Sequence, residues 1–286
     1  MPRRWYGWLF SLCFIVFFLS QGQKYPAYSQ FSFLVSESIL RHHTPVLNGF
    51  VIPGLDPAKL PSRLTPAAWR PFYQLVRIDG KILYTYPPGS SILSLPFVAA
   101  LNLCGLRATD RDGNFDDWHE AEMQRIVAAL LMAALVGVFM ASAALLLTSR
   151  ASLAITLVAA FGTPIWSSAS RTMWSHTWEI SLGGCAALML LRAAEKHARL
   201  NPVILGTLMS WAYFVRPTGA IVILGVTIYV MFEHREEFLV YAATGLIWLG
   251  GFLVYCWSTF GRLLPDYYRQ AQRYTRPTSV RASRAF

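Results

Sequence analysis

Three side chains that could bind a phosphate, Arg171, His176 and Arg216, stand beside long apolar stretches of this chain. A guanidinium binds phosphate oxygens bidentately, and ionisable groups at membrane depth are costly unless they are paired or functional. If the three share one cavity, they suit a phosphate group. The alternative is that both arginines end helices at the interface and extend to water. Arg216 has no acidic neighbour in the sequence, which favours the functional interpretation.

Most other polar residues lie in one long loop, from residue 21 to about residue 88. Near its end, residues 73–78 and 81–86 are rich in β-branched, aromatic and aliphatic side chains. Asp79 and Gly80 separate them and tolerate the positive φ angles of a type I′ turn. We therefore expect a β-hairpin at the membrane surface, stopped by the prolines that follow.

An acidic segment over residues 110–122 carries six carboxylates and could hold a metal ion. Acidic residues just before a long helix are also expected from capping and from the helix dipole, and this is the interpretation we prefer. The pair His42-His43 has no other obvious metal ligands nearby in the sequence. We interpret this pair as part of a solvated loop, and we predict no metal site.

The composition indicates a polytopic membrane protein. Of the 286 residues, 55% are hydrophobic and 14% are charged, whereas a soluble domain carries roughly 25% charged residues. The net charge of +10 is explained by topology and anionic lipid, so we predict no nucleic-acid partner. The four cysteines lie inside apolar runs without metal-site spacing. No phosphate-binding glycine loop and no soluble-hydrolase motif is present.

We predict an all-α fold with about seven transmembrane helices and a large first extracytoplasmic loop that contains a short helix and the hairpin. The stretch 202–232 is too long for one crossing, and Arg216-Pro217 should break it into two short spans. The predicted regions are a first span over 1–20, the extracytoplasmic loop 21–122, a helix bundle over 123–257 and a basic, loosely ordered tail over 258–286. Within the bundle we expect spans at 126–147, 152–166, 180–191 and 238–257, besides the two in 202–232.

Two topological questions stay open in the sequence. The first apolar segment has no small-x-small cleavage site after it, so we expect an uncleaved span with a cytoplasmic N-terminus rather than a signal peptide. The segment 90–106 either crosses or lies along the outer surface as a juxtamembrane helix. The positive-inside rule favours the surface position, because the basic turn 192–199 then faces the cytoplasm. The arginines of the tail then lie outside, which counts against this arrangement.

Five segments, in order along the chain, resemble motifs of bacterial integral-membrane glycosyltransferases of the GT-C class, which includes protein O-mannosyltransferases and lipid A aminoarabinose transferases. Ile78–Gly89 is similar to DGxxYSKYPPG, Thr172–His176 to TLWQH, and Val215–Thr218 to LTRPT. Ser36–Thr44 resembles the first-loop helix of the class, and Phe260–Tyr268 resembles YGSPLPxYY. The likeness is to the N-terminal half of these enzymes.

The resemblance implies a transferase in the bacterial inner membrane that takes a sugar from a polyprenyl-phosphate donor at the outer face. It implies a first-loop carboxylate that acts as general base or orients the acceptor, a juxtamembrane helix over 90–106, and cationic or metal stabilisation of the leaving phosphate. The donor phosphate would contact Arg171, His176 and Arg216. The entrance for acceptor or lipid would be shaped by Tyr84, Tyr86, Pro87, Pro88 and Gly89.

The chain departs from the class at two positions. The acidic residue of the class falls near Tyr28-Ser29-Gln30, where this chain has no carboxylate, so Glu37 becomes the candidate base. The lysine before Tyr-Pro-Pro is Thr85 here. Relatives continue with further spans, so we expect a truncated frame, a degenerate paralogue or a fragment. The alternatives to an enzyme are a transporter or flippase for a lipid-linked sugar, and a structural membrane subunit. The sugar, the acceptor and any divalent metal stay open.

Overall fold

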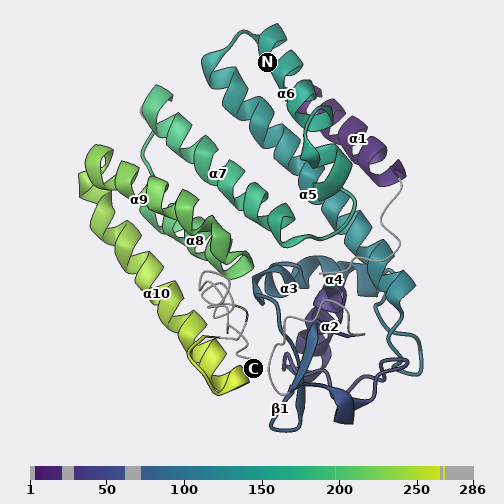
Figure 1. Ribbon diagram of the computed structural model, residues 1–286. Coiled ribbons are helices and arrows are strands. Elements are labelled where there is room, and N and C mark those ends of the chain that lie inside the picture. The colour runs from purple at the N-terminus through teal and green to yellow at the C-terminus, as the bar shows by residue number, and fades with distance from the viewer. Residues whose placement is uncertain (1–3, 21–28, 62–71, 197, 265–266, 268–286) are drawn as a thin grey trace, which may run out of the picture.

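The computed structural model describes residues 4–20, 29–61, 72–196, 198–264 and 267, and the chain is mostly helical. A bundle of long helices forms one part, and a loop domain, made by residues 29–61 and 72–116, covers one end of it (Figure 1). Most of the predicted tail 258–286 lies outside the described residues. The prediction that it is loosely ordered therefore stays a prediction.

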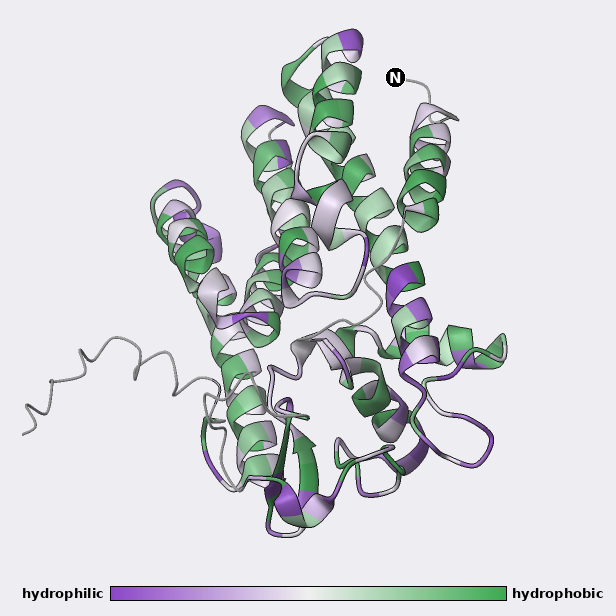
Figure 2. Cartoon of the chain, turned by 45° about the vertical axis from the view of Figure 1, so that its right-hand side comes forward, coloured by the Kyte–Doolittle hydropathy of each residue, from purple (hydrophilic) through white to green (hydrophobic). Residues whose placement is uncertain are grey.

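Within the described residues, seven helices make up the bundle, and neighbours in the chain mostly pack against each other. The central helix α5 contacts α1, α6 and α7, whereas α8 contacts α7 and α10. The helices are α1 (Arg4–Leu19), α5 (Asp117–Leu146), α6 (Ser149–Phe161), α7 (Ser175–Lys196), α8 (Pro202–Val215), α9 (Ala220–Glu233) and α10 (Arg235–Phe260). The residues of these helices are largely hydrophobic, with hydrophilic residues near the helix ends (Figure 2).

Among the described residues, two helices, α5 and α10, are long and apolar enough to cross a membrane. The apolar helices α1, α6, α8 and α9 are shorter. A helix of 14 residues, such as α8, extends ~21 Å at 1.5 Å per residue, less than the ~30 Å of a hydrocarbon core. Length and composition therefore support two membrane-spanning helices and do not support the predicted seven.

Two predicted spans differ from the structure at their ends. The span 152–166 is interrupted, because α6 ends at Phe161 and a separate π-helical turn, η2 (Ile165–Ala169), begins after Pro164. Proline has no amide hydrogen and cannot continue the helical ladder. The next helix, α7, begins at Ser175 rather than Ile180. His176, expected in a polar turn, therefore lies in the first turn of a helix.

The predicted break at Arg216-Pro217 is confirmed. Helix α8 ends at Val215, Arg216 has an extended backbone, and the short turn η3 (Pro217–Gly219) leads into α9. Because the residue before a proline is disfavoured in the helical region, the sequence itself sets this boundary. The break leaves the guanidinium of Arg216 at the end of a helix rather than along its side.

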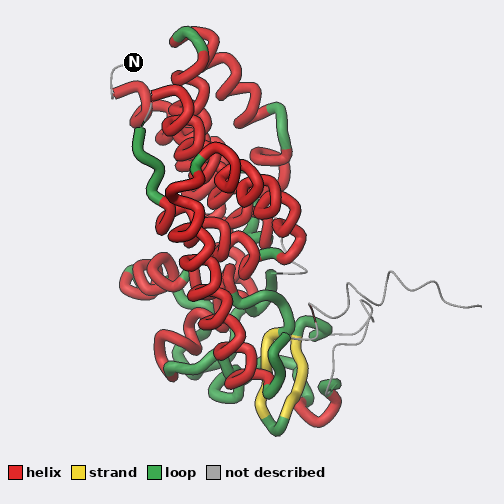
Figure 3. Tube along the Cα trace, turned by 90° about the vertical axis from the view of Figure 1, so that its left-hand side faces the viewer, coloured by secondary structure: helices red, strands yellow, loops and turns green. Residues whose placement is uncertain are grey.

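The hairpin is also confirmed, with shorter strands than predicted. Strand β1 (Leu75–Ile78) pairs antiparallel with β2 (Lys81–Tyr84), and they form a two-stranded sheet (Figure 3). Asp79 and Gly80 have φ angles of 48° and 78°, as a type I′ turn requires. The sheet packs on α2 (Ser32–His42) and the 3₁₀ turn η1 (Pro57–Lys59) lies nearby, so the loop domain has its own apolar core.

Two short helices of the loop domain, α3 (Gly89–Leu93) and α4 (Leu95–Leu103), lie on its side that faces the bundle (Figure 1). They occupy the segment predicted to lie along the membrane surface. A buried carboxylate also joins the two parts: Glu120 of α5 accepts hydrogen bonds from the backbone amides of Phe31 and Phe33, at 2.8 Å each. Because these amides begin α2, Glu120 fixes that helix on the bundle.

Candidate functional site

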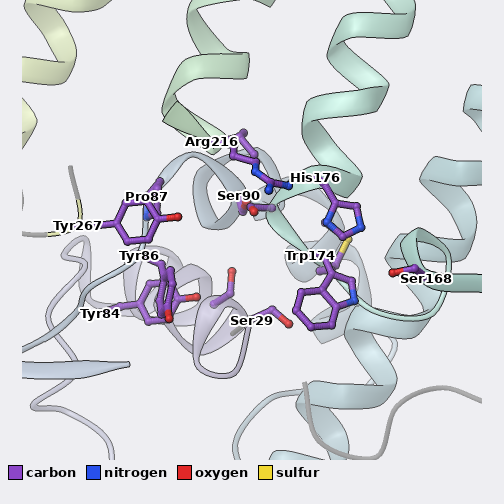
Figure 4. A pocket seen from close by; sticks show the side chains of 14 residues that line it. Ser29, Tyr84, Tyr86, Pro87, Ser90, Ser168, Trp174, His176, Arg216 and Tyr267 are labelled. Atoms are coloured by element: carbon purple, nitrogen blue, oxygen red, sulfur yellow. The ribbon is translucent and has the colours of Figure 1, made fainter. Parts of the chain in front are cut away.

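The candidate functional site is a cavity of about 530 Å³ between the end of the bundle and the loop domain. Its size lies in the range of small-molecule sites, about 300–1,000 Å³. The side chains come from the end of the hairpin, from the start of α7 and from the break after α8 (Figure 4). The lining residues are Ser29, Ser32, Tyr84, Tyr86, Pro87, Ser90, Ser168, Met173, Trp174, Ser175, His176, Val215, Arg216 and Tyr267.

Among the described lining residues, Arg216 supplies the fixed positive charge of the cavity. Its Nε atom lies 3.6 Å from Oε2 of Glu179, and the two side chains are 37% and 20% exposed. The sequence interpretation that Arg216 lacks an acidic neighbour holds only along the chain, because α7 brings Glu179 beside it. The distance is long for a direct hydrogen bond. Glu179 therefore attracts the guanidinium without a short hydrogen bond, and Arg216 lines the cavity.

His176 lies one turn before Glu179 on α7, and its ring stacks on Trp174 with the ring centroids 5.9 Å apart. Burial lowers the pKa of His176 below its ordinary value, and the nearby charge of Arg216 lowers this pKa further. At pH 7 the imidazole is therefore largely neutral and able to accept a proton. The sequence analysis predicted His176 at the site but not Trp174, although Trp174 belongs to the same motif, Thr172–His176.

The opposite wall is aromatic. The rings of Tyr84 and Tyr86 lie 5.5 Å apart, and those of Tyr86 and Tyr267 lie 5.2 Å apart, measured between centroids. Burial is the main cause that raises the pKa of Tyr84 well above its ordinary value, so this phenol stays neutral. Tyr84, Tyr86 and Pro87 were predicted at this site. Tyr267 was missed, although its segment was already part of the resemblance.

Ser29 was also not predicted at this site. Its backbone is held at the cavity by a chain of hydrogen bonds. The carbonyl of Ser29 accepts from Nε2 of Gln124 at 2.9 Å, and Oε1 of Gln124 accepts from the hydroxyl of Thr172 at 3.0 Å. All three residues are buried. The sequence offers one weak indication of this site, the serine and threonine residues near Ser29 and Thr172. It is weak because such residues are also common in ordinary loops.

Glu37 is not among the described residues that line the cavity, so its assignment as general base stays a prediction that this geometry does not favour. The carboxylate is fully buried and accepts from the amide of Ala108 at 2.6 Å and from the hydroxyl of Thr109 at 3.1 Å. Arg41 pairs with it at 3.2 Å. Both oxygens are thus used to tie α2 to the segment before α5. None of the described residues that line the cavity is a carboxylate.

Three other predicted residues lie beside the cavity rather than in its lining. Pro88 contributes to a small pocket against the end of α10. A Cβ atom on Gly89 would lie 2.5 Å from the backbone carbon of Phe214, so this glycine permits the contact between α3 and α8. Nε of Arg171 donates to the carbonyl of Trp166 at 3.3 Å. Arg171 itself is not a lining residue, although Ser168 before it and Met173 to His176 after it are.

The acidic segment caps α5, as preferred from the sequence. Asp116 accepts from the amides of Trp118 and His119 at 3.0 Å each, while Asp110 accepts from the amides of Asp112 and Asn114. Within the described part of the chain, no group of three or more histidine, cysteine or acidic side chains could hold a metal ion.

Comparison with protein-family models, with curated proteins and with solved structures finds no match to this chain. The fold and the site by themselves define a mostly helical protein with two helices suited to a membrane and a polar, aromatic cavity at one end of its bundle.

Proposed function

We propose that this protein is a membrane glycosyltransferase of the GT-C type, which binds the head group of a polyprenyl-phosphate sugar in the cavity and transfers the sugar to an acceptor. One observation carries the proposal: residues far apart in sequence, from the hairpin end, the start of α7 and the α8–α9 break, line one cavity. The same three segments carry the resemblance to that class. The proposal includes a position in the inner membrane of a bacterium, with the cavity at the outer face.

The finer topology belongs to this proposal. In it, α1, α6, α7, α8 and α9 cross the membrane together with α5 and α10, and a thinned bilayer accommodates the short ones. The break between α8 and α9, at η3, would then place Arg216 near the outer interface. If only α5 and α10 cross the membrane, the cavity is unchanged, because the same residues form the walls of the cavity in either topology.

Arg216 is the proposed phosphate contact. Its guanidinium lines the cavity, and its ion pair with Glu179 is loose enough to leave donors for a second anion. A lipid phosphate that leaves with negative charge is stabilised by such a fixed cation. His176, one turn from Glu179, supplies a second contact to the same anion or to the acceptor.

Transfer requires that a hydroxyl of the acceptor attack the anomeric carbon of the sugar. The carbon–oxygen bond to the phosphate breaks, its electron pair goes to the leaving polyprenyl phosphate, and the hydroxyl proton goes to a base. We propose His176 for this base, because it is the imidazole in the described lining and Glu37 lies elsewhere. A neutral imidazole at pH 7 fits this role.

The lack of a carboxylate among the described lining residues favours a second candidate. A transporter or flippase for a lipid-linked sugar needs the same phosphate contact and no base. The two candidates share binding of the donor lipid and differ only in whether the sugar is transferred.

The test measures donor binding and sugar transfer separately, with radiolabelled polyprenyl-phosphate hexose and purified protein in nanodiscs. We expect Arg216→Gln to weaken binding by about tenfold or more, the scale of a lost charge-assisted hydrogen bond. Since this change leaves Glu179 unpaired, the Arg216→Gln/Glu179→Gln double variant is included to restore the charge balance.

Arg192→Gln is the matched control, because this exposed arginine lies near the other end of α7. It should bind the donor as the natural chain does. Binding with transfer supports the enzyme, whereas binding without transfer supports the transporter. Absence of donor binding, or equal binding by the Arg216 variants, would overturn the proposed function.

A further inference from the structure

The two sides of the cavity differ in charge. Arg216 and His176 lie on the bundle side, whereas Ser29, Tyr84 and Tyr86 lie on the other side (Figure 4). The described residues of this second side carry hydroxyl groups and aromatic rings, with no carboxylate, amine or guanidinium. Its chemistry therefore suits a neutral, hydroxyl-bearing ligand rather than a second anion.

Ser29 contributes a buried hydroxyl group to this side. It is 5% exposed, and its hydroxyl oxygen is buried without a hydrogen-bond partner in the protein. The position of Ser29 is fixed, because its carbonyl accepts from both Gln124 and the amide of Ser32. Buried hydroxyl groups almost always have partners, and a ligand bound in the cavity can supply the bond that the hydroxyl of Ser29 lacks.

Other buried serines close to the cavity show the contrast. The hydroxyls of Ser32 and Ser91 bond to each other at 3.0 Å, and Ser36 donates to the carbonyl of Ser91 at 2.8 Å. Ser94 accepts from the indole of Trp178 at 3.1 Å. The protein itself thus supplies hydrogen-bond partners for these hydroxyl groups. The hydroxyl group of Ser29, in the cavity wall, has no such partner.

We propose that the Ser29 side of the cavity binds the sugar ring of the lipid-linked donor and that this sugar is uncharged. The inference rests on the proposed function, in which Arg216 holds the phosphate. A sugar ring presents hydroxyls that can pair with Ser29 and C–H faces that can pack on the tyrosine rings. A charged sugar would be desolvated on this side without a counter-charge from the described residues.

The experiment compares two probes, polyprenyl phosphate without a sugar and polyprenyl-phosphate hexose, in the same nanodisc binding assay. Ser29→Ala should bind the sugar-free lipid with unchanged affinity and the hexosyl lipid about tenfold more weakly, because one hydrogen bond to the sugar is lost. Its unfolding temperature should be unchanged or higher, since an unpaired buried hydroxyl is removed. Ser29→Cys, which is nearly isosteric, gives the same comparison if the alanine variant does not fold.

Ser36→Ala is the matched control, because its hydroxyl is buried and bonded inside the protein. It should lower the unfolding temperature and keep the natural ratio of the two affinities. An unchanged ratio in both Ser29 variants would overturn the sugar assignment while leaving phosphate binding intact. Tighter binding of an amino-sugar or uronic-acid lipid than of the hexosyl lipid would overturn the uncharged class. Failure of the natural chain to bind either probe would instead contradict the proposed function.

Discussion

At the scale of single residues, the buried carboxylates of this protein anchor its parts to one another. Glu37 accepts from Ala108 and Thr109, and Glu120 accepts from the amides at the start of α2. A carboxylate in water-free surroundings is stable only when such donors surround it. These two side chains therefore hold the cavity wall in shape without entering the cavity.

We predict that Glu37→Gln destabilises the fold by about 1–3 kcal/mol, the cost of leaving buried hydrogen-bonding groups poorly paired, and leaves donor-lipid affinity unchanged. Thermal unfolding followed by tryptophan fluorescence, together with the nanodisc binding assay, measures both. Glu122→Gln is the control, because that side chain is 40% exposed in its pair with Arg125, and it should change stability by less than about 1 kcal/mol. Loss of transfer by Glu37→Gln at unchanged stability would restore Glu37 as the base.

The second residue-scale prediction concerns pH. The pKa of His176 is lowered from its ordinary value of 6.5, first by burial and then by Arg216, so the neutral form dominates at pH 7 and is lost only as the pH falls below 6.5. Glu179 lies one turn further along the same helix, beside Arg216, and Tyr84 across the cavity stays neutral because burial raises its pKa. The transfer rate should therefore be constant near pH 7 and decline in acid. His176→Asn should bind donor, transfer slowly and lose this acidic decline; an unchanged profile would exclude the imidazole as base.

At the scale of elements, Gly89 sets how closely α3 approaches α8. A Cβ atom there would lie 2.5–2.6 Å from backbone atoms of Phe214 and Val215, and backbone cannot move aside as a flexible side chain can. Val215 and the next residue, Arg216, line the cavity. The close packing that Gly89 permits between α3 and α8 therefore helps to fix the position of Arg216, the proposed phosphate contact.

We predict that Gly89→Ala destabilises the protein by about 1–3 kcal/mol, as overpacking does, and weakens donor binding because the end of α8 shifts. Gly137→Ala in α5 is the control, since a Cβ atom there meets nothing within 4 Å, and alanine should stabilise that helix by roughly 0.5–1 kcal/mol. Chemical unfolding and donor binding of both variants provide the measurement. Equal stability of the two alanine variants would contradict the close contact.

The sequence predicted those elements that local chemistry determines. The Asp79-Gly80 turn and the break before Pro217 were found because each needs particular backbone angles in a few adjacent residues. It did not predict the early start of α7 or the role of Glu37, because both depend on residues distant in the chain. In the sequence, Ser29 was noted only because the class has an acidic residue near this position. The fold shows that the hydroxyl of Ser29 lies in the cavity wall without a partner.

At the scale of the whole molecule, the loop domain and the cavity lie at one end of the bundle, while the α7–α8 connection lies at the other (Figure 1). The exposed residues Asp79, Thr218 and Glu195 mark these places. If the bundle crosses a membrane as proposed, the first two share one side and the third lies opposite.

We predict that Asp79→Cys and Thr218→Cys react with a membrane-impermeant thiol reagent added outside intact cells, whereas Glu195→Cys does not react until the membrane is opened. The exposed native Cys104 is replaced by serine in this background. Labelling of Asp79→Cys and Thr218→Cys from opposite sides would contradict the common compartment on which the account depends.

The most direct test of the central claim is photocrosslinking with a polyprenyl-phosphate sugar that carries a photoreactive group on its head group, followed by mass spectrometry of the labelled peptides. The account predicts labels in the hairpin end around Tyr86, in the segment around Trp174 and near Arg216, all removed by an excess of unlabelled polyprenyl phosphate. Labels confined to the lipid-facing surfaces of the helices, or labels that the competitor does not remove, would contradict it.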